Sequence, residues 1–237
     1  MSIFDHLEQA PASGKADRVV ILLHGYGSNK EKAFEQAPWV AAAFPGAQIY
    51  SADGTFPYIG ILDPKSPNMN DEPTEGRRVW YHRYSEATRQ EGLAETREKL
   101  DAYIDECAEA AGVARERVAV IGLSQGAIML LNSVPFIERR FGAAICHSGY
   151  LFSPDSLAQR QEQLAEFKAA VVGRTPVCSI HGYLDHTLPW QTHLEAANLF
   201  DESGIPVEFH LLSGVKHAEF EPRSQQIAIE YIGRTLE

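Results

Sequence analysis

The stretch VAVIGLSQGAIMLL, residues 118–131, decides the fold of this chain. Its first four residues are apolar and predict a buried strand, and residues 127–131 predict a helix. Between them lies a Gly-x-Ser-x-Gly pattern with Ser124 at its centre. Flanking glycines let the backbone turn sharply from strand to helix, so that the serine hydroxyl stands clear of the sheet. The alternative interpretation is an ordinary strand-to-helix turn with a serine N-cap.

Short apolar runs recur on both sides of this stretch, at 19–23, 48–50, 143–146, 177–180 and 207–212. Segments with helical periodicity lie between most of them, at 93–111, 157–171, 191–200 and 225–236. Strands that are apolar throughout and alternate with helices imply an α/β protein with a mostly parallel central sheet covered by helices on both faces. No repeat, low-complexity tract or linker divides the sequence, so we predict a single domain over residues 1–237.

The composition excludes several classes of protein. The chain is 44% hydrophobic and 22% charged, which suits a globular core and excludes a disordered or fibrous chain. A formal net charge of −11 would repel phosphate backbones, so no nucleic-acid partner is expected. No stretch reaches the roughly 18 apolar residues needed to cross a bilayer, so no stable membrane insertion is expected. The N-terminus lacks the apolar run of a signal peptide, and three widely spaced cysteines suit a reducing compartment, so we expect a cytoplasmic protein.

Two later motifs supply partners for Ser124. A serine hydroxyl is a poor nucleophile at neutral pH and needs a base that is itself oriented by a carboxylate. Asp185 follows the strand predicted at 177–180, and His217 follows the strand predicted at 207–212. This is the chain order serine, acid, histidine that accompanies such a strand–serine–helix turn. We therefore predict a catalytic triad, although a turn aspartate and a solvated loop histidine are the simpler alternatives.

The tetrahedral intermediate of acyl transfer needs hydrogen-bond donors aimed at its oxyanion. We predict one donor at the backbone N–H of Gln125, directly after the nucleophile, and a second at the main chain of Tyr26. Tyr26 lies between two glycines in the loop after the first long strand. In the same loop, His24 is interpreted as a structural histidine because His217 already fills the position of the base.

Histidine and aspartate side chains cluster at residues 181–186 and raise the alternative of a metal site. The cluster comprises His181, Asp185 and His186, with no further well-spaced set of ligands beside it. We therefore predict neither a metal nor a cofactor.

Residues 53–83 break the alternation of strands and helices, and we predict a long loop insertion at about 53–84. The segment is rich in Pro, Gly, Asn and Asp, and a structureless loop of about thirty residues is uncommon in a compact domain unless it is functional or disordered. Its aromatic and apolar residues favour a flap that faces the substrate and sets acyl specificity, with contacts from Tyr58, Ile59 and Trp80. The alternative is a surface loop held against its own domain by Trp80.

Taken together, these motifs resemble the phospholipase/carboxylesterase family of α/β-hydrolases, which includes bacterial carboxylesterases and acyl-protein thioesterases. The matching motifs are LHGYG at 23–27, GLSQG at 122–126, SGY at 148–150, HGYLD at 181–185 with Pro189, and GVKH at 214–217. The resemblance implies an α/β-hydrolase fold without a large cap domain. It also implies hydrolysis of carboxylic esters or thioesters through an acyl-enzyme on Ser124. Two departures are Ala127, where many members have glycine, and the longer, more polar segment at 53–83.

Two other functions are compatible with the sequence. A dienelactone-hydrolase-like enzyme normally carries cysteine where this chain has Ser124. A non-catalytic protein with a hydrolase fold would bind a ligand in a pocket that performs no chemistry. The expected partner is a small-molecule or acylated substrate, and the sequence is equally compatible with a monomer and a homodimer.

Overall fold

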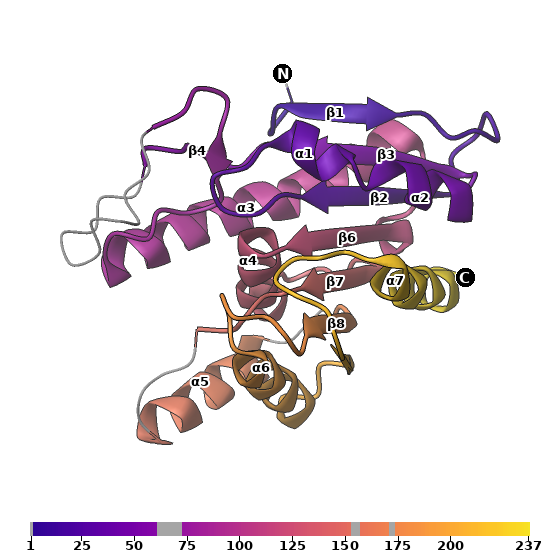
Figure 1. The fold of residues 1–237 in the computed structure, drawn as a ribbon. Helices are drawn as coiled ribbons and strands as arrows, with labels where there is room; N and C mark the ends of the chain where they lie inside the picture. The colour runs from indigo at the N-terminus through magenta and orange to yellow at the C-terminus, as the bar shows by residue number, and fades with distance from the viewer. Residues whose placement is uncertain (1, 61–72, 153–156, 171–173) are drawn as a thin grey trace.

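A seven-stranded sheet forms the centre of the protein (Figure 1). The computed structural model describes residues 2–60, 73–152, 157–170 and 174–237. The strand order is β1-β3-β2-β6-β7-β8-β9, in which β1 runs antiparallel to β3 and every other neighbouring pair is parallel. The strands are β1 (His6–Gln9), β2 (Arg18–Leu23), β3 (Ala47–Ala52), β6 (Val118–Leu123), β7 (Ala143–His147), β8 (Val177–Gly182) and β9 (Val207–Leu212). The predicted mostly parallel sheet is confirmed.

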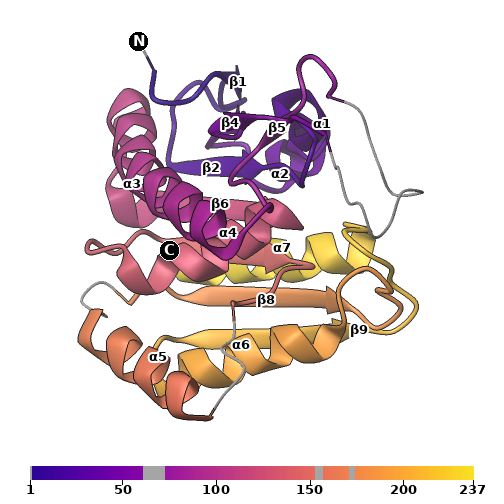
Figure 2. The same cartoon turned by 90° about the vertical axis from the view of Figure 1, so that its left-hand side faces the viewer.

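Helices cover both faces of this sheet, as predicted. One face is packed by α1 (Lys30–Phe34), α2 (Ala37–Ala43) and α7 (Pro222–Thr235), which lie in front of the sheet in Figure 1. The other face is packed by α3 (Glu86–Ala111), α4 (Gln125–Ser133), α5 (Leu157–Ala170) and α6 (Trp190–Glu202), as the view in Figure 2 also shows. Short 3₁₀ helices span Arg115–Arg117 and Val134–Phe136.

The sheet separates two hydrophobic clusters because side chains alternate along each strand. In β2, Val19 and Ile21 join the cluster under α3 and α4, whereas Val20 and Leu22 join the cluster under α1, α2 and α7. All four side chains are at most 1% exposed. A strand buried on both faces reads as a continuous apolar run, which is why the sequence predicts these central strands well.

Helix α3 begins a full two turns before the predicted start at residue 93. Its first turns carry few apolar residues and therefore give no periodic signal. The start is set by a capping box, in which the Ser85 hydroxyl accepts the Thr88 N–H and the Thr88 hydroxyl accepts the Ser85 N–H. The helix ends at Gly112, whose φ of 68° is readily adopted by glycine.

The segment predicted as a loop at 53–84 contains a small second sheet. Strand β4 (Phe56–Pro57) pairs antiparallel with β5 (Arg78–Val79), and residues 61–72, including Ile61, lie outside the described part of the chain. In Figure 1 this sheet lies on the left, on the side toward which the arrowheads of β2 and β6 point. The prediction of a loop is therefore wrong for β4 and β5, which are too short to give a periodic pattern.

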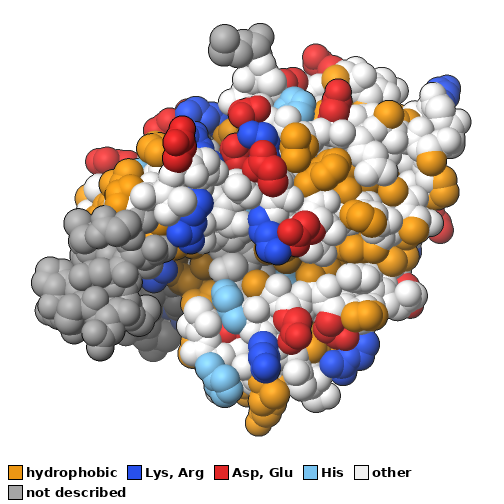
Figure 3. All heavy atoms as spheres, turned by 45° about the horizontal axis from the view of Figure 1, so that its top comes forward, with side chains coloured by type: hydrophobic (Ala, Val, Ile, Leu, Met, Phe, Trp, Pro, Cys, Tyr) orange, Lys and Arg blue, Asp and Glu red, His pale blue; other side chains and the backbone are white. Residues whose placement is uncertain are grey.

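The surface carries charges of both signs. Figure 3 shows acidic and basic side chains interspersed over the face that includes the β1 edge of the sheet. None of the helices in the described ranges combines the length and apolar character needed to span a bilayer. The three cysteines are free and buried, and burial raises the pKa of the Cys107 thiol to about 12.

Candidate active site

Ser124 lies on a tight turn between β6 and α4, at the C-terminal end of a central strand. Its φ of 50° and ψ of −113° are unusual for a residue with a side chain, and such strain is often found at functional sites. A Cβ atom on Gly122 would lie 2.6 Å from the backbone of Gly126, and one on Gly126 would lie 2.7 Å from Leu23 O. Both glycines are therefore required by close backbone packing.

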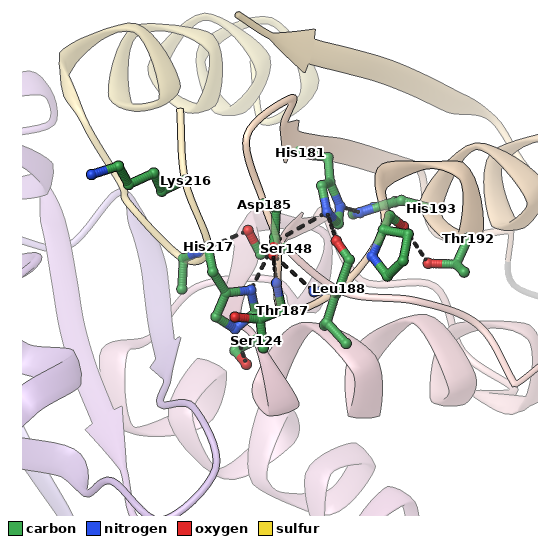
Figure 4. Close-up of polar contacts among 12 residues, drawn as sticks. Ser124, Ser148, His181, Asp185, Thr187, Leu188, Thr192, His193, Lys216 and His217 are labelled. Atoms are coloured by element: carbon green, nitrogen blue, oxygen red, sulfur yellow. Dashed lines mark hydrogen bonds and ion pairs between the residues drawn. The ribbon is translucent and has the colours of Figure 1, made fainter. Parts of the chain in front are cut away.

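The structure brings the three predicted triad residues together from three different strand ends (Figure 4). Ser124 Oγ lies 2.9 Å from His217 Nε2, and His217 Nδ1 lies 2.7 Å from Asp185 Oδ2. The other oxygen, Asp185 Oδ1, accepts the N–H groups of Thr187 and Leu188 at 2.9 and 2.8 Å. The carboxylate is thus fixed on both oxygens.

These contacts determine the protonation of the site. Burial alone would raise the pKa of the Asp185 carboxyl, but hydrogen bonds from the Leu188 N–H and from His217 outweigh this effect and lower it below its ordinary value. Asp185 is therefore an anion at neutral pH and can only accept hydrogen bonds. His217 Nδ1 must then carry a hydrogen, which leaves Nε2 as the acceptor for the Ser124 hydroxyl.

The two predicted oxyanion donors lie on segments that meet at Ser124. Gln125 is the first residue of α4, and an N–H at this position has no acceptor within its own helix. The loop that contains Tyr26 passes close by, because a Cβ atom on Gly25 would lie 3.4 Å from the Cβ of Ser124. The side chain of Gln125 is buried and joins the turn to the segment after β5 by accepting the Trp80 N–H at 3.0 Å.

His24 holds the Tyr26 loop in place, in agreement with its interpretation as a structural histidine. Its Nε2 accepts the Gly54 N–H at 2.9 Å, so its Nδ1 donates to Gly25 O at 2.7 Å. Burial lowers the pKa of His24 to about 4, which keeps the ring neutral at pH 7. The backbone oxygen of His24 accepts the indole N–H of Trp80 at 2.8 Å.

The three residues predicted to contact substrate differ in how far they are exposed, so one of the predictions is wrong and the other two remain predictions. Trp80 is fully buried, and its hydrogen bonds support His24 and Gln125, so the prediction that Trp80 contacts substrate is wrong. Tyr58 is also buried and packs edge-on against the Tyr26 ring at 5.5 Å. Ile59 is 45% exposed, which leaves its side chain accessible to a ligand.

Sequence reasoning assigned no role to two residues that hold the triad in place, Ser148 in the SGY motif and His193. Ser148 Oγ accepts the Ala218 N–H at 2.9 Å and so ties the His217 loop to the end of β7. His193, in α6, lies 2.6 Å from His181 in a fully buried pair. A polar residue on the buried face of α6 was the available signal. Within the described ranges, no group of three or more His, Cys, Asp or Glu side chains is arranged to hold a metal ion.

A mostly parallel α/β sheet that presents a serine on a strand–helix turn, then an aspartate, then a histidine defines the α/β-hydrolase class. The sequence profile of the phospholipase/carboxylesterase family matches residues 5–236. The chain therefore belongs to the phospholipase/carboxylesterase family.

Several individual relatives are distant in sequence but cover most of the chain. The esterase YpfH of Escherichia coli (strain K12) is 24% identical over 234 residues, which is 98% of this chain and 89% of the relative. A protein of Oryza sativa subsp. japonica described as a probable inactive carboxylesterase is 25% identical over 90% of this chain and 82% of its own length. The crystal structure of esterase PE8 superimposes with a TM-score of 0.76 at 21% identity, covering 98% of this chain and 99% of the other.

Proposed function

We propose that this protein is a serine hydrolase that cleaves carboxylic esters or thioesters through an acyl-enzyme on Ser124. The observation that carries the proposal is the hydrogen-bonded chain from Ser124 Oγ through His217 to Asp185, with distances of 2.9 and 2.7 Å. Such a chain lets the histidine take the serine proton as the oxygen attacks a carbonyl carbon. Family membership and the similarity to named esterases support the same reaction class.

The acylation step follows from the positions of these groups. Ser124 Oγ attacks the carbonyl carbon while His217 Nε2 takes its proton, and the anion of Asp185 stabilises the resulting imidazolium. The negative charge on the carbonyl oxygen is met by the N–H groups of Gln125 and Tyr26. When the tetrahedral intermediate collapses, His217 returns the proton to the leaving alcohol or thiol.

Deacylation repeats these steps with water as the nucleophile. His217 takes a proton from the water, whose oxygen attacks the acyl carbon, and then gives that proton to Ser124 Oγ as the ester bond breaks. The products are a carboxylic acid and the free enzyme. The expected substrate is a small ester or an acylated molecule, and we propose that the segment around Tyr58 and Ile59 contributes to the choice of acyl group.

The competing function is a hydrolase fold that binds a ligand without turnover. The relative from Oryza sativa that is described as a probable inactive carboxylesterase makes this alternative concrete. Labelling with a fluorophosphonate probe separates the two, because phosphonylation requires an activated serine. We expect stoichiometric labelling of Ser124 in the wild-type protein and none in Ser124→Ala. A folded wild-type protein that resists the probe and hydrolyses no p-nitrophenyl ester would show that the non-catalytic alternative is right.

A further inference from the structure

Two buried histidines extend the hydrogen-bonded chain of the triad beyond its carboxylate (Figure 4). His181 lies near the end of β8 and His193 lies in α6, and both side chains are fully buried. His181 Nε2 is 3.1 Å from Asp185 Oδ2 and 3.0 Å from Leu188 O. His181 Nδ1 is 2.6 Å from His193 Nδ1. The acyl-transfer steps described above use neither ring.

The surrounding atoms decide which nitrogen of each ring carries the hydrogen. Asp185 Oδ2 and Leu188 O can only accept, so His181 Nε2 is the N–H donor. Burial lowers the pKa of His181 and holds the pKa of His193 well below its ordinary value, so both rings are neutral. The Nδ1 of neutral His181 is then an acceptor, and the facing Nδ1 of His193 must donate.

The opposite tautomer of His193 would be unfavourable for two reasons. Two nitrogen lone pairs would face each other at the 2.6 Å contact with His181. An N–H would also be buried at His193 Nε2, an atom that has no hydrogen-bond partner and lies in a ring next to Phe209. An unpaired buried donor of this kind costs free energy. The donor direction therefore runs from His193 to His181, and the His181 N–H lies between two acceptors, Leu188 O at 3.0 Å and Asp185 Oδ2 at 3.1 Å.

We propose that His181 and His193 are positioning residues for Asp185, in that His193 fixes the tautomer of His181 and His181 shares the Oδ2 atom with His217. The inference rests on the proposed serine hydrolase mechanism. The contact from His181 anchors the Asp185 carboxylate from the side of β8, in addition to the two backbone N–H groups that bind Oδ1. It also divides the negative charge of Oδ2 between two donors, so less of that charge stabilises the His217 imidazolium.

The other ionisable groups around His217 do not reach the carboxylate. Its own loop carries Lys216 and Glu219, and the Glu219 carboxylate accepts the Lys216 backbone N–H at 3.1 Å. From β7, His147 is within electrostatic range but bonds to Ser148 and Ser224 through its ring nitrogens. Of the described residues, His181 and His217 are the two whose rings contact Asp185. A change in the charge on Oδ2 can therefore be produced selectively at position 181.

Two amide variants of His181 provide a matched test. The amide nitrogen of His181→Gln reaches the position of the imidazole Nε2 and keeps a donor for Asp185, whereas the shorter side chain of His181→Asn reaches only the position of Nδ1. The readout is the rate of fluorophosphonate labelling of Ser124 as a function of pH. We expect the midpoint of the acid limb to rise by about 0.5 to 1 pH unit in His181→Asn, because more of the carboxylate charge then acts on His217. His181→Gln should keep the wild-type midpoint.

A control separates this effect from loss of packing. Cys178 is a fully buried neighbour in β8 that belongs to the opposite hydrophobic cluster. Cys178→Ala should lower the melting temperature and leave the midpoint unchanged. An unchanged midpoint in a fully labelled His181→Asn protein would overturn the proposal, as would an equal shift in Cys178→Ala. If the wild-type protein is not labelled at all, the proposed function fails instead.

The tautomers can be measured without any catalytic assay. Nitrogen-15 NMR of the histidine rings distinguishes Nδ1–H from Nε2–H, and His181→Asn and His193→Leu assign the two signals. We expect His181 as the Nε2–H form and His193 as the Nδ1–H form at neutral pH. Observation of His193 as the Nε2–H form would overturn the proposed direction of the chain, whatever the activity of the protein.

Discussion

Ser124 adopts a backbone conformation that favours glycine, since its φ is 50°. The strain is maintained because Gly122 and Gly126 pack tightly against backbone atoms. A side-chain Cβ at Gly122 would lie 2.6 Å from the nearest backbone atom, and one at Gly126 would lie 2.7 Å from Leu23 O. At the scale of single residues, stability and reactivity therefore oppose each other at the nucleophile.

Replacement of the nucleophile should show both effects. Ser124→Ala removes the attacking hydroxyl, so we expect kcat to fall on the order of 10⁴- to 10⁶-fold with the fold unchanged. Ser124→Gly should be equally inactive but more stable than Ser124→Ala by about 1 kcal/mol, because glycine relieves the strain. Ester hydrolysis and urea unfolding measure the two quantities. More than a few per cent of wild-type activity in Ser124→Ala would show that another residue is the nucleophile.

The carboxylate of Asp185 gives a second prediction at this scale. The base must be neutral to accept the serine proton, so kcat/KM should rise with pH to a plateau. Asp185→Asn keeps the shape of the side chain but removes the charge, and kcat should fall by about 10⁴-fold. Steady-state kinetics as a function of pH test both statements. A variant with near wild-type kcat would exclude Asp185 as the acid of the triad.

At the scale of elements, the short strands β1, β4 and β5 owe their formation to pairing within the fold more than to their own sequence patterns. Strand β1 is short and lies at the sheet edge, where its pairing with β3 comes from the fold rather than from its own pattern. Strands β4 and β5 pair with each other across a segment whose sequence shows no helical or strand periodicity. Trp80 follows directly after β5, is fully buried, and donates its indole N–H to His24 O. The β4–β5 pair therefore helps to hold the loop that contains His24 and Tyr26 next to Ser124.

The exposed residue after β4 tests the role of this segment in specificity. From the proposed role of this segment in acyl choice, Ile59→Ala should lower kcat/KM on long-chain p-nitrophenyl esters relative to the acetyl ester, because the Ile59 side chain is apolar and 45% exposed. Leu211→Ala is a matched control, since Leu211 is 37% exposed on β9. Tyr58→Ala should shift the preferred acyl length and also lower the rate on every ester, because Tyr58 packs against Tyr26. An equal fall for all chain lengths in Ile59→Ala would contradict a role in specificity.

At the scale of the whole molecule, buried neutral histidines link stability to pH. Burial lowers the pKa of His24 to about 4 and that of His147 to about 3. An unfolded histidine binds a proton near pH 6.5, so below that pH the unfolded state binds more protons than the folded state. The contribution of these groups to stability is therefore complete above about pH 6.5 and is lost as the pH falls toward 4 and then 3.

We expect the free energy of unfolding to fall steeply between about pH 6.5 and pH 4, by on the order of 3 kcal/mol for each of His24 and His147. Urea unfolding at several pH values measures the slope. His147→Gln removes one titrating group while retaining an amide near Ser224, so its slope should be smaller than that of the wild-type protein. Equal slopes for the two proteins would contradict the assignment of part of this pH dependence to His147.

The sequence by itself determined the central strands, the strand–serine–helix turn and the order of Ser124, Asp185 and His217. A strand buried on both faces is largely apolar, and such strands precede Ser124 and Asp185, whereas the strand before His217 is a partly buried edge strand. Only the tertiary structure decided which side chains support them. The sequence around Trp80 and His193 does not identify their hydrogen-bond partners, because those partners, His24 and His181, come from other elements of the fold. Burial and hydrogen bonding to distant residues are properties of the packed molecule, and they set both the position of Asp185 and its charge.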